Sequence, residues 1–281
     1  MSTTTVSLGD GAAERAARAA GVEVRPVDDL DELREMVALF STIWGTPPLT
    51  TELLRAFSKA GDFVGGAFDE GRLVGGCVGF FGPPAHHAMH SHIAGVAASA
   101  RRRHVGFALK ALQREWALAR DVATVEWTFD PLVARNAHVN VVKLAADPVQ
   151  YLPDFYGPMG DAINGGDATD RLLVRWDLVS PEAERACAGI PRRVDLARLV
   201  ADGAGVALGV GSRGEPVAAD GPTDSPVTLV AVPRDVEALR VTEPALAREW
   251  RTAVREALGR LLDDSGRVVG FDASVGYVVR R

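Results

Sequence analysis

The spacing of apolar and polar residues divides the first part of the chain into short strands and amphipathic helices. A strand is predicted over residues 22–27. A helix follows over 30–44, where Asp28 can cap the N-terminus and the apolar residues recur every three or four positions. A second short helix is predicted over 50–62. Two strands then flank the sequence DEGR, which is typical of a hairpin turn.

The pattern continues with a third strand near residues 90–98 and a long helix after it. One face of that helix is apolar and carries Val105, Ala108, Leu109, Leu112, Trp116 and Ala119. A strand over 122–129, a helix over 134–146 and a strand over 170–178 come next. Antiparallel strands followed by alternating strands and helices predict an α/β fold with a mixed sheet covered by helices.

The composition of the sequence changes beyond about residue 178. Residues 201–226 are rich in Gly and Pro and predict loop with weak strands. A strand over 227–233, a long amphipathic helix and a strand over 267–279 follow. We therefore expect an N-terminal helix and tail over 1–21, a main domain over 22–180, and an α+β extension over 181–281 packed on that domain.

Composition and charge exclude several classes of protein. The 281 residues are 47% hydrophobic and 24% charged, and the formal net charge is −6. An acidic chain without a broad basic face does not favour binding to nucleic acid or to an anionic membrane. Only two cysteines, Cys77 and Cys187, are present, and no apolar run is long enough to cross a membrane. No export signal is visible, so a cytoplasmic location is expected.

The sequence SARRRHVGFALK, residues 99–110, joins the third strand to the long helix. A helix N-terminus presents unpaired amides and a partial positive charge, which together bind phosphate. A glycine allows close approach of the backbone, and arginines add charge-assisted hydrogen bonds. The stretch is therefore either a phosphate-binding turn or an ordinary solvated basic turn.

This stretch resembles the pyrophosphate loop of GNAT-superfamily acetyltransferases, whose signature is Gln/Arg-x-x-Gly-x-Gly/Ala. The order of elements over residues 22–178 is also similar to the GNAT fold, and more narrowly the chain resembles a bacterial group of GNAT acetyltransferases without an assigned substrate. The signature fits in two registers, beginning at Arg103 or at Arg101. We favour Arg101, which puts the last glycine at Gly106 and His104 in place of the first glycine.

The resemblance implies acetyl-CoA, or another acyl-CoA, as cofactor. It assigns cofactor contacts to the strand backbone, to the turn with the first helical residues, and to two asparagines of the following helix. These residues are Ala94, Gly95, Val96, Arg101, Arg102, Arg103, His104, Val105, Gly106, Phe107, Ala108, Asn136 and Asn140. Asn140 stands where relatives often have the tyrosine that protonates the leaving thiolate.

Acetyl transfer needs a base for the acceptor amine and an acid for the thiolate. Glu126 and Asp130 alternate along the strand 122–129 and its end, so each is a candidate base. Each also has a structural interpretation, as a surface or salt-bridged residue and as a turn residue. Tyr156 is the candidate acid, or a packed aromatic beside a Gly turn, while His92 and Trp127 are expected to line the acceptor site. The histidines of this region lack the spacing of a metal site.

These observations predict a GNAT-like acyl-CoA N-acyltransferase fold with a C-terminal α+β extension. The function expected from the resemblance is transfer of an acyl group from acetyl-CoA to the amine of a small-molecule acceptor. Two other readings stay open: a non-catalytic acyl-CoA-binding or regulatory protein, and an interaction domain without cofactor. The oligomeric state is open as well, with a homodimer among the options.

Overall fold

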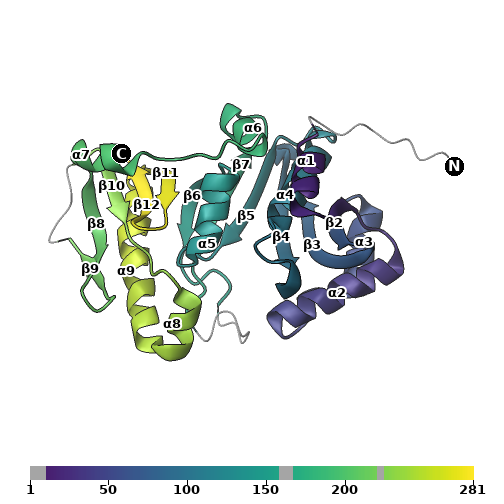
Figure 1. The fold of residues 1–281 in the computed structure, drawn as a ribbon, viewed down its shortest axis with the longest axis horizontal. Helices are drawn as coiled ribbons and strands as arrows, with labels where there is room; N and C mark the ends of the chain where they lie inside the picture. The colour runs from purple at the N-terminus through teal and green to yellow at the C-terminus, as the bar shows by residue number, and fades with distance from the viewer. Residues whose placement is uncertain (1–10, 158–166, 220–224) are drawn as a thin grey trace. The chain divides into compact units, whose positions relative to one another are not determined.

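The structure, a computed structural model, describes residues 11–157, 167–219 and 225–281 (Figure 1). The chain packs as two compact units. The first contains residues 1–126 and 177–180, and the second contains residues 127–176 and 181–281. The boundary falls inside a strand, after Glu126, whereas the sequence predicts a division near residue 180. The polar tail expected before the first helix lies outside the described residues.

The first unit is a mixed sheet with helices on both faces. Its elements are α1 (Ala12–Ala20), β1 (Glu23–Pro26), α2 (Leu30–Trp44), α3 (Thr51–Ala60), β2 (Phe63–Asp69), β3 (Arg72–Phe81), β4 (Ala88–Val96), α4 (Val105–Leu118) and the start of β5 (Thr124–Phe129). The strand order is β1-β2-β3-β4-β5. All neighbours are antiparallel except β4 and β5, which are parallel. The predicted mixed α/β architecture is confirmed.

Two adjacent glycines in β3 explain how helices cover both faces of this sheet closely (Figure 1). A Cβ atom on Gly75 would lie 3.1 Å from Leu109 of α4, whereas one on Gly76 would lie 3.0 Å from Met36 of α2. Successive strand residues face opposite sides of a sheet, so these two positions contact opposite helix layers. The absence of side chains there lets α2 and α4 approach the backbone of β3.

The local predictions for the first unit hold with two adjustments. Asp29, not Asp28, caps α2, and its carboxylate accepts hydrogen bonds from two amides of the first turn at 2.9 and 3.1 Å. Strand β4 begins at Ala88 and ends at Val96, two residues earlier than the pattern predicts. The hairpin between β2 and β3 is confirmed, with Glu70 and Gly71 at φ values of 48° and 79°.

The second unit contains a five-stranded sheet of order β11-β12-β10-β8-β9 and the antiparallel strands β6 and β7, which follow β5 in the order β5-β7-β6. Its elements are the end of β5, α5 (Ala134–Ala137), a π-helical segment (His138–Lys143), β6 (Asp147–Leu152), β7 (Arg171–Asp177), α6 (Pro181–Cys187), α7 (Leu196–Ala201), β8 (Gly205–Val210), β9 (Pro216–Ala218), β10 (Val227–Val230), α8 (Val236–Thr242), α9 (Pro244–Asp263), β11 (Arg267–Asp272) and β12 (Gly276–Arg280). This second sheet confirms the expected C-terminal α+β character.

Four features of the second unit differ from the sequence prediction. The predicted helix over 134–146 consists of one turn of α-helix, α5, followed by the π-helical segment. Strand β6 was not predicted, because Pro148 and a register shift break its alternation. The strand expected over 267–279 is a hairpin of two strands, β11 and β12. A short helix, α8, precedes the long helix α9 as a separate element.

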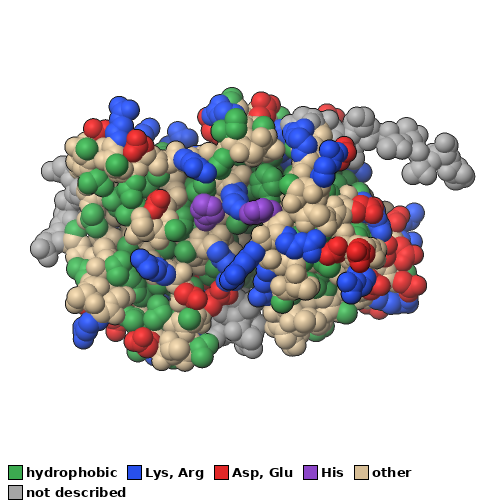
Figure 2. Space-filling model, in the orientation of Figure 1, with side chains coloured by type: hydrophobic (Ala, Val, Ile, Leu, Met, Phe, Trp, Pro, Cys, Tyr) green, Lys and Arg blue, Asp and Glu red, His purple; other side chains and the backbone are tan. Residues whose placement is uncertain are grey.

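The charged side chains of the first unit are mixed in sign. Figure 2 shows acidic and basic groups interspersed over α2 and α3 on the face in view. Ion pairs such as Arg25–Glu32 and Arg34–Asp31 belong to this pattern. In the part of the chain that the structure describes, no helix is long and apolar enough to cross a membrane.

Candidate functional site

The Arg-rich turn leads directly into the N-terminus of α4. Arg102 and His104 have φ values of 66° and 65°, in the left-handed region that favours glycine. His104 is the N-cap, and its carbonyl accepts a hydrogen bond from the amide of Phe107 at 3.0 Å. The amides of Val105 and Gly106 have no protein acceptor among the described residues. The start of this 14-residue helix therefore offers two N–H groups to an anion.

Space and charge around this helix start suit a phosphate. A Cβ atom on Gly106 would meet nothing closer than Val96 Cγ2, at 3.9 Å, so the backbone is open to a ligand. Arg101 and Arg102 are exposed, and His104 is exposed beside them. Two mobile guanidinium groups next to available amides form a typical anion-binding arrangement.

Arg103 has a structural position within the same turn. Its Nη1 donates to Asp69 Oδ2 at 2.7 Å, and its Nη2 donates to the carbonyl of Gly21 at 2.9 Å. Its Nε also donates to the carbonyl of Ala20 at 3.3 Å. The guanidinium beside Asp69 lowers the pKa of that carboxyl group. Arg103 thus joins the end of α1 and the β2–β3 hairpin to the turn, and its donors are committed there.

Strand β4 separates from β5 just before the turn. The parallel pairing runs from Ala88 with Thr124 to His90 with Glu126, and β4 then continues to Val96 alongside β3 only. Ala94 on this stretch is exposed. Gly95 serves packing, since a Cβ atom there would lie 2.7 Å from Ile43 of α2. The described part of β4 therefore has a free edge between His90 and the Arg-rich turn.

Two histidines and one carboxylate meet at the point where β4 leaves β5. The rings of His90 and His92 lie 6.0 Å apart, and each packs near Phe80, at 5.1 and 5.8 Å. A register shift in the β3–β4 pairing makes His92 the bulged residue. Partial burial lowers the pKa of both histidines, and Glu126 across the strand opposes this effect for His90. Both imidazoles are accordingly neutral at neutral pH and can accept a proton.

The sequence analysis treated His90 only as part of a possible metal motif. Among the described residues, no group of three or more His, Cys, Asp or Glu side chains could hold a metal ion. The signal for a proton-transfer role was the spacing itself, because residues 90 and 92 share one face of a strand. What the sequence could not supply was the neighbouring Glu126, which comes from a different strand.

The opposite face of β4 carries a buried polar network beneath α4. Lys110 Nζ donates to Ser91 Oγ at 2.7 Å and to Gln113 Oε1 at 3.0 Å. Gln113 Nε2 in turn donates to the thiol sulfur of Cys77 at 3.5 Å. Burial lowers the pKa of Lys110 to about 8 and raises the pKa of the Cys77 thiol. This network belongs to the core of the first unit, and sequence reasoning did not identify it.

Tyr156 lies in the second unit and is 43% exposed. Its hydroxyl group and Thr128 Oγ1 are 3.1 Å apart and share a hydrogen bond. Its ring packs edge-on against Phe155 at 4.7 Å, and the Arg171 guanidinium lies 5.2 Å from the ring centroid. The phenol is thus oriented from several sides while its ring stays accessible.

Asp130 is part of a buried ion-pair network in the second unit. Its carboxylate accepts hydrogen bonds from Arg251 at 2.8 and 2.9 Å and from Arg240 at 2.5 Å. Asp167 shares the same two arginines, at 3.0 Å from Arg251 and 3.2 Å from Arg240. Although burial opposes ionisation, the two guanidinium groups lower the pKa of Asp130 to about 2. A carboxylate with such partners is a poor proton acceptor, so the geometry favours Glu126 over Asp130 as a candidate base.

The remaining predicted site residues also lie in the second unit. Trp127 is 6% exposed and packs perpendicular to Trp176, so its ring is part of a core. Asn136 is half-buried in α5 and is not the cap of that helix, which begins after Val133. Asn140 is buried in the π-helical segment. The structure thus brings the predicted residues of the turn and of β4 together in the first unit only.

The fold and the site of the first unit define a class. It is an α/β protein whose central parallel strands separate beside a helix N-terminus with available amides. Residues 30–139 match the family model described as the acetyltransferase (GNAT) family. This segment, which makes up less than half of the chain, is therefore similar to the GNAT acetyltransferases.

Solved structures with a similar fold come from several bacteria. An N-acetyltransferase from Staphylococcus aureus is 16% identical, with a TM-score of 0.46, and the match covers 56% of this chain and 98% of that one. A ribosomal-protein-alanine N-acetyltransferase from Brucella melitensis is 20% identical, with a TM-score of 0.47 and coverage of 54% and 98%. The yncA protein from Salmonella typhimurium, solved with its cofactor acetyl-CoA, is 13% identical, with a TM-score of 0.47 and coverage of 58% and 99%. No curated protein matches this sequence.

Proposed function

We propose that this chain is an acetyl-CoA-dependent N-acyltransferase that transfers an acyl group directly to the amine of an acceptor. The observation that carries the proposal is the free edge of β4, which runs from His90 to the anion-binding start of α4. The family match over residues 30–139 supports it, because that segment contains both features.

The residues present fit acetyl-CoA, the cofactor of the GNAT superfamily. The amides of Val105 and Gly106 and the side chains of Arg101 and Arg102 would hold its phosphates. The edge of β4 beyond His90, which includes the exposed residue Ala94, would hydrogen-bond its extended arm. When bound, the cofactor supplies an acyl group activated as a thioester.

The chain's own contribution to the chemistry is proton transfer. His92 is neutral, exposed and placed on the bulge of β4, so we assign it as the group that accepts the proton of the acceptor amine. His90 and Glu126 are positioning residues, because the His90 ring packs 6.0 Å from that of His92 and Glu126 lies opposite His90 on β5. Glu126 is the alternative base. Tyr156 stays the predicted proton donor, and Asn136 and Asn140 stay predicted cofactor contacts.

The acceptor class follows from the charge of the chain. A net charge of −6, with surface ion pairs such as Arg25–Glu32 and Arg34–Asp31, does not favour a polyanionic partner. We expect a small-molecule amine. A cationic amine would also be attracted by the negative field of the protein.

His104 favours a second candidate function. It stands at a position with φ of 65° where the GNAT signature has glycine, and its side chain is exposed next to the available amides. A side chain there could shield the bound phosphate from its full set of contacts. A protein that binds acyl-CoA as a sensor, without turnover, would tolerate this change.

Calorimetric titration with acetyl-CoA and with free CoA tests the proposal, followed by thiol release with a panel of amines. We expect micromolar binding and release with at least one amine. Gly106→Trp should abolish binding because the new ring occupies the open space, while Ala56→Trp on the exposed face of α3 should not. Binding without release from any amine would support the sensor, and no binding at millimolar ligand would refute both functions.

A further inference from the structure

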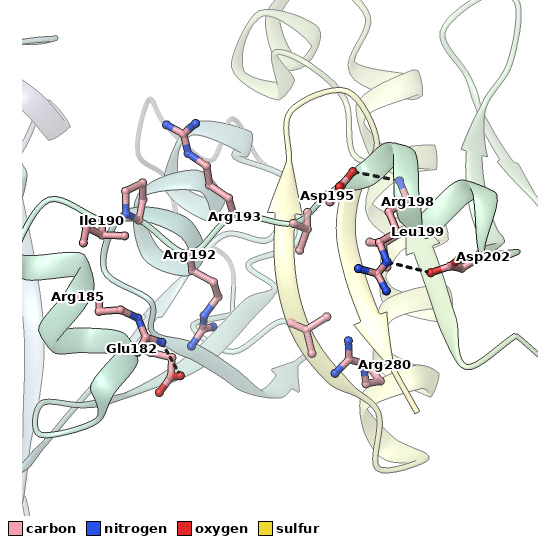
Figure 3. A pocket seen from close by; sticks show the side chains of 13 residues that line it. Glu182, Arg185, Ile190, Arg192, Arg193, Asp195, Arg198, Leu199, Asp202 and Arg280 are labelled. Atoms are coloured by element: carbon pink, nitrogen blue, oxygen red, sulfur yellow. Dashed lines mark hydrogen bonds and ion pairs between the residues drawn. The ribbon is translucent and has the colours of Figure 1, made fainter.

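The second unit contains a cavity of about 700 Å³ that the proposed reaction does not use (Figure 3). Its walls come from α6, the segment 188–195, α7, and the strands β11 and β12. Its charged lining consists of Glu182, Arg185, Arg192, Arg193, Asp195, Arg198, Asp202 and Arg280. Five arginines face three carboxylates there, which gives a local excess of two positive charges in a chain of net charge −6.

The arginines of the cavity differ in their partners. Arg185 pairs with Glu182 at 2.9 Å, and Arg198 pairs with Asp202 at 3.5 Å (Figure 3). Arg192 is held by Asp147, outside the cavity lining, at 2.7 Å. In contrast, Arg193 and Arg280 have no carboxylate partner among the described residues, and both are exposed. After these pairs are formed, the charged groups left in the lining are the guanidinium groups of Arg193 and Arg280 and the carboxylate of Asp195, which accepts a hydrogen bond from the amide of Arg198.

The position of Arg280 adds a second observation that concerns positive charge beside the cavity. Arg280 of β12 lies directly opposite Arg267 of β11 in the antiparallel register. Side chains at directly opposed positions point to the same face and interact, and like charges there are destabilising. Arg267 also has no carboxylate partner in the described part of the chain. A bound anion would relieve this repulsion.

The walls of the cavity are fixed in place, which favours a preformed binding site. The amide of Arg192 donates to the carbonyl of Val142 at 2.9 Å, and its guanidinium donates to the carbonyl of Ala145 at 2.9 Å. Val194 packs so closely on β11 that a Cβ atom on Gly270 would lie 2.3 Å from it. Arg193 thus extends from a backbone anchored on both sides.

Apolar side chains also line the cavity. The pairing of β11 with β12 shifts register between Val268 and Gly270, so Val269 is a bulged residue that lines the cavity. Ile190 and Leu199 line it as well. A ligand that combines negative charge with an apolar body matches this lining better than a bare inorganic ion.

We propose that this cavity binds a small organic dianion, with Arg193 and Arg280 as its charged contacts and Val269 against its apolar part. The site lies within the second unit alone and is independent of the proposed acyltransferase function. A monoester phosphate on a small hydrophobic group has this chemistry near neutral pH.

The test is calorimetric titration of the full chain with phenyl phosphate at pH 7.5, with phenol as the uncharged comparison. We expect saturable binding of phenyl phosphate and none of phenol. Arg193→Ala and Arg280→Ala should each weaken binding about tenfold or more, because each removes a charge-assisted contact. Arg248→Ala, which removes an exposed charge from α9 outside the cavity, should leave the affinity unchanged.

The Gly106→Trp variant separates this site from the turn in the first unit. Binding that persists in Gly106→Trp and is lost in Arg280→Ala would support the cavity. Binding lost in Gly106→Trp alone would place the phosphate at the turn and overturn the proposal. Equal loss in Arg248→Ala, or no binding of phenyl phosphate at all, would also overturn it. The substituted arginines are exposed, so the variants are expected to fold, and circular dichroism verifies this.

Discussion

The buried ammonium group of Lys110 should make the stability of the protein rise with pH in the alkaline range. Burial lowers the pKa of Lys110 from 10.5 to about 8. The unfolded chain therefore binds more protons than the folded chain between pH 8 and 10.5, and stability increases with pH in that window. Since one pKa unit corresponds to about 1.36 kcal/mol, the full gain is about 3 kcal/mol.

The variant Lys110→Met isolates this effect. Removing the amine also removes its hydrogen bonds to Ser91 and Gln113, so the stability difference at a single pH mixes two contributions. The change of this stability difference with pH depends only on the ionisation of Lys110. We expect the free energy of unfolding of the parent protein, relative to Lys110→Met, to rise by about 3 kcal/mol from pH 7.5 to 10.5.

Urea denaturation at a series of pH values measures this difference. Lys59→Met is the matched control, because Lys59 is exposed on α3 and should give no pH-dependent difference. A flat difference for Lys110→Met, equal to that of Lys59→Met, would show that the Lys110 ammonium is solvated in the folded state. The reasoning from burial would then be refuted.

Three other predictions concern the proposed acyltransferase site of the first unit and the buried ion-pair network of Asp130. If His92 accepts the proton of the amine, His92→Gln should lower kcat/KM by about 10²-fold or more and remove the acidic limb of its pH profile; a variant that kept the limb would point to Glu126. His104→Gly should stabilise the chain by about 0.5–1 kcal/mol, because a glycine adopts positive φ without steric cost, and it should tighten CoA binding; urea midpoints and calorimetry measure both effects, and lower stability with weaker binding would contradict them. Asp130→Ala should destabilise the protein by about 3–5 kcal/mol, since it leaves two buried guanidinium groups with Asp167 as their one shared carboxylate; a loss of activity at unchanged stability would instead restore Asp130 as a candidate base.

The elements that the sequence predicted well are those whose cause is local. Helix α2 has regular apolar spacing, and the hairpin before β3 has a turn sequence that accepts positive φ. Even there, the choice of Asp29 over Asp28 as the cap depends on backbone geometry, because both residues carry the same carboxylate. Strand β6 was missed because Pro148 and a register shift remove the alternation on which the prediction rests.

The parts that could not be predicted depend on distant segments. Lys110 lies off the predicted apolar face of α4, yet it is buried because its side chain packs against β4, where it donates a 2.7 Å hydrogen bond to Ser91. Asp130 reads as a turn residue or a base in the sequence, but its partners Arg240 and Arg251 lie 110 and 121 positions away. No local pattern connects such residues.

The arginines show why pairing matters more than composition for function. Arg103 belongs to the most conspicuous basic run in the sequence, yet its donors are used by Asp69 and two carbonyls. Arg193 and Arg280 attract no attention in an acidic chain, yet they share a cavity without carboxylate partners among the described residues. An arginine whose N–H donors already have protein partners stabilises the fold. An arginine without a carboxylate partner, in a cavity whose backbone is held in place, favours the binding of an anionic ligand. By this argument we expect two ligand-binding arginines in the run 101–103, Arg101 and Arg102, rather than three. We expect two more in the second unit, Arg193 and Arg280, which no sequence pattern indicates.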